Sequence, residues 1–379
     1  MRPIAIARRL VGLVLVVTLG LGGCASLVGP DKPKPKALEP LTPQNIAGAL
    51  WNQRIGAVQF PLTVVVAGGA FTLGASDGTV LAIDIETGRD RWRANVGAAL
   101  SAGVGSDGRF ASVVTQAGEL VTLEGGQVKW RKPVGTRVAT APLVAGERVF
   151  VLGVDRTVQA FDALDGRKLW TLQRPGDPLT LAQSGVLAAF KNTLVVGQGP
   201  RMAGVDPTAG TIRWEVPIGA PRGANEVVRL ADLIGPVARI GNVLCARSFQ
   251  AAVGCVDADR GALLWTKNTG GTDAVAGDAS YLFGADASDR TTARRLDGGL
   301  VAWTSDALLN HGLSTPVVLG GSVVFGASDG TLHWFSRDKG EAQLRLPTDG
   351  SAVVATLSVS GSTLLAVTRS GGLFAFRSR

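Results

Sequence analysis

The residues of this 379-residue chain that could support catalysis or bind a metal are few and widely separated. The two histidines, His311 and His333, have no cysteine or carboxylate at the spacing that zinc ligands require. His333 stands beside Trp334 in a predicted strand, which favours a structural role. The sequence also lacks a Gly-x-Ser-x-Gly elbow, a phosphate-binding P-loop and a glycine-rich dinucleotide turn. It therefore predicts no catalytic residue, no metal site and no bound cofactor.

The first of the three cysteines, Cys24, follows a segment typical of protein export. Three arginines precede an apolar core at Val11–Leu21, which is too short for a permanent membrane helix. Leu21-Gly22-Gly23-Cys24 then resembles the bacterial lipobox, in which the signal is cleaved before a cysteine that becomes acylated. We therefore predict a signal peptide over residues 1–23 and lipidation of Cys24. The alternative is an ordinary signal peptide, or a membrane anchor with an incidental cysteine.

The segment after the lipobox, residues 24–43, is rich in proline and lysine. This composition favours extended, solvated conformations, so we interpret it as a tether. Its lysines either rest on anionic headgroups or simply keep a spacer soluble. Ala25 and Ser26 follow the cysteine without an aspartate, a pattern that resembles lipoproteins sorted to the outer membrane.

The charge of the chain is mildly basic. The net charge is +8, and three of the arginines belong to the predicted signal peptide, which leaves +5 for the rest. The sequence has no extended lysine- and arginine-rich run with repeated aromatic residues inside it, so we expect no nucleic-acid binding. Charged residues make up only 18% of the chain and 51 residues are glycine, as expected for many short strands joined by tight turns.

A tag of the form Asp-x-x-x-Gly-x-x-x-Trp recurs along the chain and organises it. The full copies are Asp84-Gly88-Trp92, Asp162-Gly166-Trp170, Asp206-Gly210-Trp214 and Asp257-Gly261-Trp265. Weaker copies end at Trp130, Trp303 and Leu344, and Trp51 stands alone before the first copy. Trp51 and the residues that end the successive copies, all tryptophans except Leu344, lie 38 to 51 residues apart along the chain. A period of about 40 residues is typical of a repeat architecture.

Each repeat contains short strands and tight turns, with no convincing amphipathic helix. In the first copy, Val80–Asp84 is a predicted strand and Asp84–Gly88 a turn. There the Asp and Thr side chains can bond the backbone, and the glycine accepts a positive φ. About four antiparallel strands per 40 residues form one blade of a β-propeller. A large tryptophan at a fixed place in each blade suits packing between blades.

The two ends of the repeat region predict how the ring closes. Ala375-Phe376-Arg377 matches the strand before each turn, but the chain stops at Arg379, and Trp51 has no strand before it. We predict that the segment around Trp51 supplies the outer strand of the last blade. Residues 44–379 then form an all-β, eight-bladed propeller of four-stranded antiparallel blades. Seven blades would require one weak tag to be spurious.

The two remaining cysteines, Cys245 and Cys255, lie symmetrically about position 250. If Ser248-Phe249-Gln250-Ala251 forms a hairpin turn, they face each other on adjacent strands. A cross-strand disulfide is then expected in an oxidising compartment. Cys255 also occupies a position that holds small residues in other repeats, so a pair of small buried thiols is the alternative. We favour the disulfide.

The tag is similar to that of the pyrroloquinoline-quinone dehydrogenases, Ala-x-Asp-x-x-Thr-Gly-x-x-x-Trp. The first copy matches it throughout, with Ala82, Asp84, Thr87, Gly88 and Trp92. The resemblance covers residues 50–379 and implies their eight-bladed propeller. Those enzymes are much longer and stack the quinone on a disulfide between adjacent cysteines, whereas the two cysteines here are ten residues apart, so the activity does not follow. A periplasmic enzyme or ligand-binding propeller of quinoprotein type is the alternative function.

The lipobox, the tether sequence Leu38-Glu39-Pro40-Leu41 and the repeats together resemble the BamB family, outer-membrane lipoproteins of the β-barrel assembly machinery. This resemblance covers the whole chain. It implies a non-enzymatic scaffold, anchored by lipid at the periplasmic face of the outer membrane, that aids insertion of barrel proteins. The implied partners are the periplasmic POTRA domains of BamA and the other subunits of the machinery. Direct contact with unfolded outer-membrane proteins is left open.

The resemblance also implies partner-binding residues in two loops that are longer than the repeat needs. Leu179-Thr180-Leu181 matches a Leu-x-Leu element of the family, and Arg229-Leu230-Ala231-Asp232 matches an Arg-Leu-x-Asp element. The family can carry an arginine where Ala182 stands and an acidic residue where Ile234 stands. We predict Leu179 and Leu181 as apolar anchors, with Arg229 and Asp232 fixing the register through charge-assisted bonds. Neutral insertion of the loops is the alternative.

Overall fold

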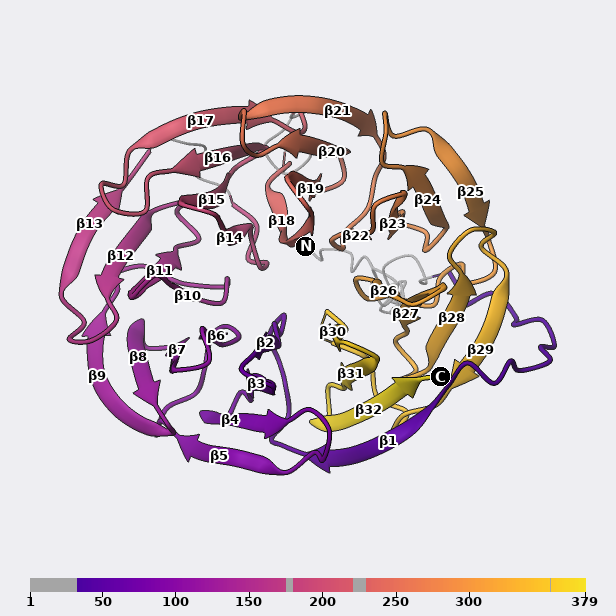
Figure 1. Cartoon of the computed structure of the whole chain (residues 1–379), viewed down its shortest axis with the longest axis horizontal. Helices are drawn as coiled ribbons and strands as arrows, with labels where there is room; N and C mark the ends of the chain where they lie inside the picture. The colour runs from indigo at the N-terminus through magenta and orange to yellow at the C-terminus, as the bar shows by residue number, and fades with distance from the viewer. Residues whose placement is uncertain (1–32, 175–179, 221–229, 355) are drawn as a thin grey trace, which may run out of the picture. The chain divides into compact units, whose positions relative to one another are not determined.

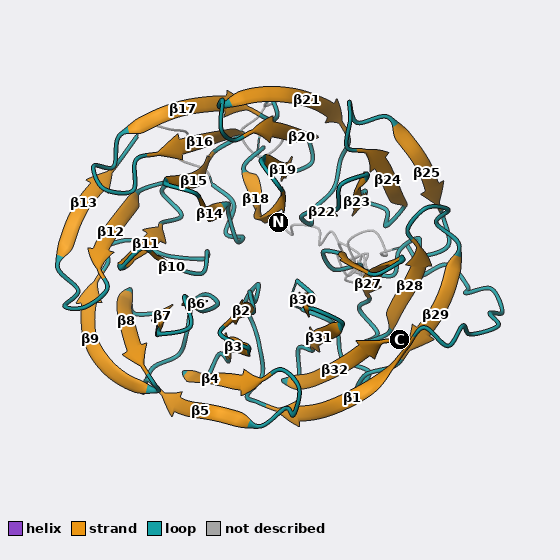
Figure 2. Cartoon of the chain, in the orientation of Figure 1, coloured by secondary structure: helices purple, strands orange, loops and turns teal. Residues whose placement is uncertain are grey.

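The computed structural model describes residues 33–174, 180–220, 230–354 and 356–379, and every regular element in them is a strand (Figure 2). The chain divides into two compact units, Met1–Lys34 and Pro35–Arg379, and all the strands belong to the second. No helix that could cross a membrane occurs in the described residues.

The strands form eight four-stranded antiparallel sheets, which are the blades of a propeller (Figure 1). Within a blade the strands run from the innermost to the outermost. Blades 1 and 2 contain β2 (Val65–Ala67), β3 (Ala70–Gly74), β4 (Thr79–Asp84), β5 (Asp90–Asn95), β6 (Gly105–Ser106), β7 (Phe110–Val114), β8 (Glu119–Glu124) and β9 (Gln127–Pro133). Blades 3 and 4 contain β10 (Leu143–Ala145), β11 (Arg148–Leu152), β12 (Val158–Asp162), β13 (Lys168–Leu172), β14 (Leu187–Phe190), β15 (Thr193–Gln198), β16 (Arg201–Val205) and β17 (Ile212–Pro217).

Blades 5 to 7 repeat the arrangement, and blade 8 is shared between the two ends of the unit. Blades 5 and 6 contain β18 (Leu233–Ile240), β19 (Val243–Ser248), β20 (Ala252–Asp257), β21 (Ala262–Asn268), β22 (Ala276–Gly277), β23 (Tyr281–Ala285), β24 (Thr291–Arg295) and β25 (Val301–Ser305). Blades 7 and 8 contain β26 (Val317–Leu319), β27 (Ser322–Gly326), β28 (Leu332–Ser336), β29 (Ala342–Leu346), β30 (Ser358–Ser360), β31 (Thr363–Val367), β32 (Gly372–Ser378) and β1 (Ala47–Arg54).

The predicted closure of the ring and the predicted count of eight blades are both confirmed. Strand β1 pairs antiparallel with β32, with Trp51 opposite Ala375 and Ala49 opposite Phe376. The N-terminal strand is therefore the outermost strand of the last blade (Figure 1). Pairing the first strand with the last removes the open edge that β32 would otherwise present to solvent.

The tag forms the turn between the third and fourth strands of a blade, as the sequence predicted. The Asp84 carboxylate accepts hydrogen bonds from the Glu86 and Thr87 amides and the Thr87 hydroxyl. Gly88 follows with φ +68°. The Arg91 guanidinium and these turn donors lower the pKa of Asp84 from 3.8 to about 2. The tag aspartates therefore serve the turns.

The tryptophans join each blade to the next. The indole of Trp130, in blade 2, lies on Gly166 in blade 3, where an added Cβ would stand 2.6 Å from the ring. Its Nε1 donates to the Ala163 carbonyl at 2.9 Å. Other indoles make the same bond across a blade boundary: Trp51 to Ile85, Trp170 to Pro207, Trp265 to Leu296 and Trp303 to Arg337. The tag glycine is therefore small because the preceding blade's indole occupies its side-chain space.

Tryptophans on the fourth strand also lie opposite a small residue on the third strand of their own blade. The pairs include Ala82 with Trp92, Ala160 with Trp170, Gly204 with Trp214 and Ala293 with Trp303. Blade 7 reverses the sizes, because Trp334 on β28 lies opposite Leu344 on β29. Leu344 precedes blade 8, whose third and fourth strands come from the two ends of the unit and share no tag turn. An indole at position 344 would thus have no tag glycine on which to pack.

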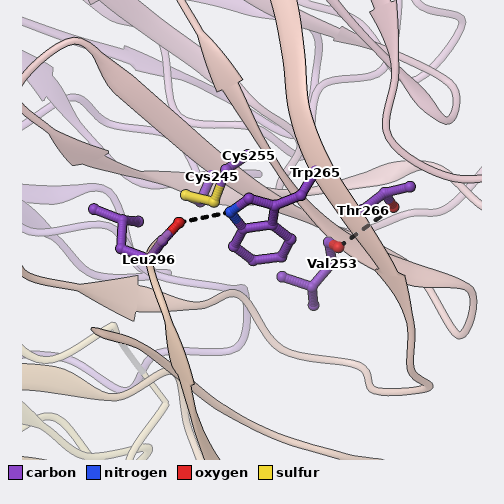
Figure 3. The surroundings of a disulfide bond; sticks show 6 residues. All are labelled: Cys245, Val253, Cys255, Trp265, Thr266 and Leu296. Carbon is purple, nitrogen blue, oxygen red and sulfur yellow. Dashed lines mark hydrogen bonds between the residues drawn. A yellow bond between two sulfur atoms is a disulfide. The ribbon is translucent and has the colours of Figure 1, made fainter. Parts of the chain in front are cut away.

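Cys245 and Cys255 are joined by a disulfide across β19 and β20, where they are directly paired. Residues Ser248–Ala251 form the hairpin turn between them. Figure 3 shows the disulfide beside Trp265, whose indole bonds the Leu296 carbonyl of the next blade. Both cysteines are fully buried. The link thus lies inside blade 5, next to the boundary with blade 6.

The residues before β1 lie along the outside of blades 6 and 7 (Figure 1). The Lys36 amide donates to the Leu309 carbonyl at 2.9 Å, and the Lys36 carbonyl bonds His311 Nε2 at 2.9 Å. Arg345 donates to the Glu39 carbonyl, and Leu38 packs against the apolar core at blades 6 and 7. The last part of the predicted tether, from Lys36 onward, is therefore held by the propeller, which its composition did not indicate.

Candidate partner-binding site

The loops that carry the predicted partner-binding residues belong to one end of the blades. Antiparallel strands place the turn between the second and third strands at the same end as the connection to the next blade. Leu181 lies in the connection from blade 3 to blade 4, and Asp232 in the connection from blade 4 to blade 5. Fifty-one residues separate the two, yet both connections reach the same rim.

The carboxylate of Asp232 joins these two connections. Its Oδ2 accepts the backbone amide of Leu181 at 3.2 Å. Its Oδ1 accepts the guanidinium of Arg156, from the turn between β11 and β12, at 2.8 and 3.2 Å. The side chains of Arg156 and Asp232 are only 17% and 15% exposed. This arrangement, the Asp232 site hereafter, comprises Arg156, Leu181 and Asp232 and links blades 3, 4 and 5.

The structure places some of the predicted site residues and leaves others outside the described residues. Leu181 and Asp232 are in contact, whereas Leu179, Arg229 and Cys24 lie in segments that are not described. Ala182 is exposed beside Leu181. Ile234 is 5% exposed at the start of β18 and forms an isolated β-bridge with Gly185. An ionised carboxylate at position 234 would therefore be buried, at a large cost unless it were paired.

Arg156 was not singled out from the sequence. It lies 76 residues before Asp232, and neither the tag nor the family motifs include it. A signal was nevertheless present. Asp77-Gly78-Thr79 and Asp329-Gly330-Thr331 form the equivalent turns in blades 1 and 7, and blade 3 has Asp155-Arg156-Thr157 in their place. An arginine where sister repeats carry glycine is a departure that the repeat alignment exposes.

Two hollows adjoin the Asp232 site. A cavity of about 390 Å³ at the inner ends of the blades is lined by hydroxyls such as Ser184, by Asp273 and by Arg369. An open groove of about 820 Å³ runs over blades 1 to 3, and its lining includes Phe60, Leu100 and Ala182. Residues next to Leu181 line both hollows, Ala182 the groove and Ser184 the cavity, and the two linings share Phe60.

Two buried titratable groups, Asp273 and His333, have shifted pKa values. Burial raises the pKa of Asp273, whose carboxylate accepts the Thr272 hydroxyl at 2.7 Å. Burial lowers the pKa of His333 from 6.5 to about 4, and neither of its ring nitrogens has a hydrogen-bond partner. In the described part of the chain, no three histidine, cysteine, aspartate or glutamate side chains gather as metal ligands. The arrangement at the rim supports binding, through an apolar loop held in place by an ion pair.

Comparison with known proteins gives consistent sequence relatives. The family model described as "Outer membrane protein assembly factor BamB" matches residues 76–305. The protein of that name from Burkholderia pseudomallei is 33% identical over 334 residues, covering 87% of this chain and 88% of the relative. The Bordetella pertussis protein of that name is 30% identical over 372 residues, covering 96% of each chain.

Solved structures share the fold. The crystal structure of BamB from Moraxella catarrhalis superimposes with a TM-score of 0.79 at 21% identity, covering 88% of this chain and all of that one. A quinohemoprotein alcohol dehydrogenase from Comamonas testosteroni gives a TM-score of 0.66 at 16% identity, over 89% of this chain and 78% of its own. At these identities the likeness extends to the propeller fold alone.

Proposed function

Since the chain belongs to the BamB family, and is therefore a non-enzymatic outer-membrane protein assembly factor, we propose that it docks on the periplasmic POTRA domains of BamA through the Asp232 site. Membership of the family makes it a component of the assembly machinery. The propeller then acts as a rigid scaffold that presents its rim loops. We further propose that a lipid anchor on Cys24 holds the scaffold at the periplasmic face of the outer membrane.

One observation carries the docking proposal: two loops far apart in sequence meet through a single carboxylate. Asp232 bonds the Leu181 amide, so the two predicted partner elements form one surface. Leu181 is half-buried and Ala182 exposed, which leaves an apolar loop edge for a partner. A few apolar anchors supply most of the binding energy in such interfaces, and the surrounding polar groups fix their register. Leu179 and Arg229 complete the proposed contact set.

Copurification with BamA tests the proposal. The variant that combines Leu179→Ala with Asp232→Ala removes one proposed anchor and the carboxylate that holds the other loop. We expect the amount of BamA recovered with the tagged lipoprotein in mild detergent to fall at least about tenfold, since truncation of central anchors typically costs 2 kcal/mol or more. Circular dichroism should show an intact propeller.

A matched control combines Leu164→Ala with Asp259→Ala. Leu164 is 53% exposed and lies in a turn at the opposite end of blade 3. Asp259 pairs with Lys191 at that same end. This control should recover BamA as the parent does. Equal recovery by the test variant and the parent would reject the assignment of the Asp232 site.

A further inference from the structure

The turn between the second and third strands has one recurring geometry in six of the blades. The fourth residue of the turn donates its amide to the carbonyl three residues earlier. The bonds are Gly78 to Ala75, Gly118 to Thr115, Arg156 to Gly153, Asp289 to Asp286, Gly330 to Ala327 and Gly371 to Thr368. In all six the donating residue has a positive φ, between +64° and +92°. Blade 5 makes the same bond, from Ala251 to Ser248, without a positive φ at Ala251. Glycine adopts this conformation freely, and other residues do so at a cost.

Two of these six positions carry a side chain despite that cost, Arg156 at φ +64° and Asp289 at φ +64°. Each uses the side chain to hold a connection between blades. Asp289 accepts the amides of Gly312 and Leu313, in the connection from blade 6 to blade 7. Backbone strain that persists in a fold is a pointer to function, because some gain elsewhere must offset it.

Arg156 differs from Asp289 in what it joins. Through Asp232 it holds two connections together, one from blade 3 to blade 4 and one from blade 4 to blade 5. Its own carbonyl accepts the Gln198 side chain of blade 4 at 3.1 Å, which fixes the turn from the other side. No other cation lies within ion-pair distance of Asp232 among the described residues. Removing the guanidinium would therefore leave a half-buried carboxylate without a counter-charge.

We propose that Arg156 is a positioning residue for partner binding: it holds Asp232, and through it the Leu181 loop, in the conformation that docks. The proposal rests on the proposed function and adds a residue that the family motifs do not contain. It assigns the guanidinium a role at the loop, without contact to the partner. The ion pair pre-organises the two loops, so less freedom is lost when the partner binds.

The substitution Arg156→Gly separates this role from folding. It installs the residue that sister blades carry and relieves the positive φ, which offsets part of the cost of the unpaired Asp232 carboxylate, so the propeller should stay folded by circular dichroism. The affinity for the purified periplasmic fragment of BamA should nevertheless fall by about tenfold, the range expected when a coupled ion pair is lost. Amide exchange at Leu181 should accelerate, because its acceptor is no longer held. Arg156→Lys, which keeps a cation, should retain most of the affinity.

Asp289→Gly is the matched control, because it makes the same change at the same turn position on the other side of the ring. It should bind BamA as the parent does. Parent-like affinity of Arg156→Gly overturns the proposal, as does an equal loss in Asp289→Gly. If Arg156→Gly fails to fold, Arg156→Gln gives the same measurement with the side chain retained. A Leu181→Asp variant distinguishes a failure of the Arg156 role from a failure of the proposed function. If Leu181→Asp also binds BamA normally, the proposed docking site itself is wrong.

Discussion

The hydrogen bond from a tryptophan to the next blade can be tested by replacing two tryptophans, only one of which makes that bond. Trp130 donates to the carbonyl of Ala163, a residue with no exposed surface. Trp92 occupies the same place in blade 1 and packs against Gly126, but its Nε1 has no acceptor within the described residues. Phenylalanine at either position keeps a ring against the glycine and removes the indole nitrogen.

The expected magnitudes follow from this difference. Each substitution loses part of a ring, about 40 Å² of apolar surface, which costs about 1 kcal/mol at 25 cal/mol per Å². Trp130→Phe additionally leaves a buried carbonyl without its donor, which costs about 1 to 2 kcal/mol more. We therefore expect the free energy of unfolding to fall by about 1 kcal/mol for Trp92→Phe and by about 2 to 3 kcal/mol for Trp130→Phe.

The assay is equilibrium unfolding in guanidinium chloride, followed by circular dichroism and checked with a second probe for coincident transitions. The two variants should share the parent's m value, so that the midpoints report stability directly. Equal losses in the two variants, or a greater loss in Trp92→Phe, would refute the idea that the indole bonds stabilise the blade boundaries.

Three further predictions follow from the fold. Replacing both Cys245 and Cys255 by alanine should lower the free energy of unfolding by about 2 to 3 kcal/mol, as expected for a link spanning ten residues. A reductant should then lower the free energy of unfolding of the parent but not that of the variant. Stability should decline as the pH falls from 6.5 toward 4, by on the order of 3 kcal/mol, because burial lowers the pKa of His333 to about 4 and the unfolded chain binds the proton first; pH titration of His333→Leu should lack this component. A chain that begins at Ile55 lacks β1 and exposes the edge of β32, so gel filtration should show association, whereas a chain that begins at Pro35 should remain monomeric.

Much of the fold was accessible from the sequence because its signals are local and repeated. An aspartate, a glycine and a tryptophan at fixed spacing mark the same turn again and again, and each copy reinforces the others. This periodicity was enough to predict eight blades, the outer strand supplied around Trp51 and the turn that Asp84 holds. The symmetric positions of Cys245 and Cys255 about residue 250 likewise placed the two cysteines on facing strands.

The site was only partly accessible. The family motifs located Leu181 and Asp232, but the interpretation of Asp232 as a residue aimed at the partner did not include its bonds within the chain. The sequence also did not predict the contacts that Lys36 and Leu38 make with the propeller, because proline and lysine content indicates how well a segment is solvated and not which residues it contacts.

What only the tertiary structure decided is which single residues meet once the ring has closed. Arg156 and Asp232 are 76 residues apart, and no period relates them. Their contact depends on the placement of three successive blades around the ring, which brings a turn of blade 3 against the connections that lead into blades 4 and 5. Short-range spacing encodes the repeating unit, whereas a one-time contact between loops arises from the packing of units and leaves no pattern in the chain.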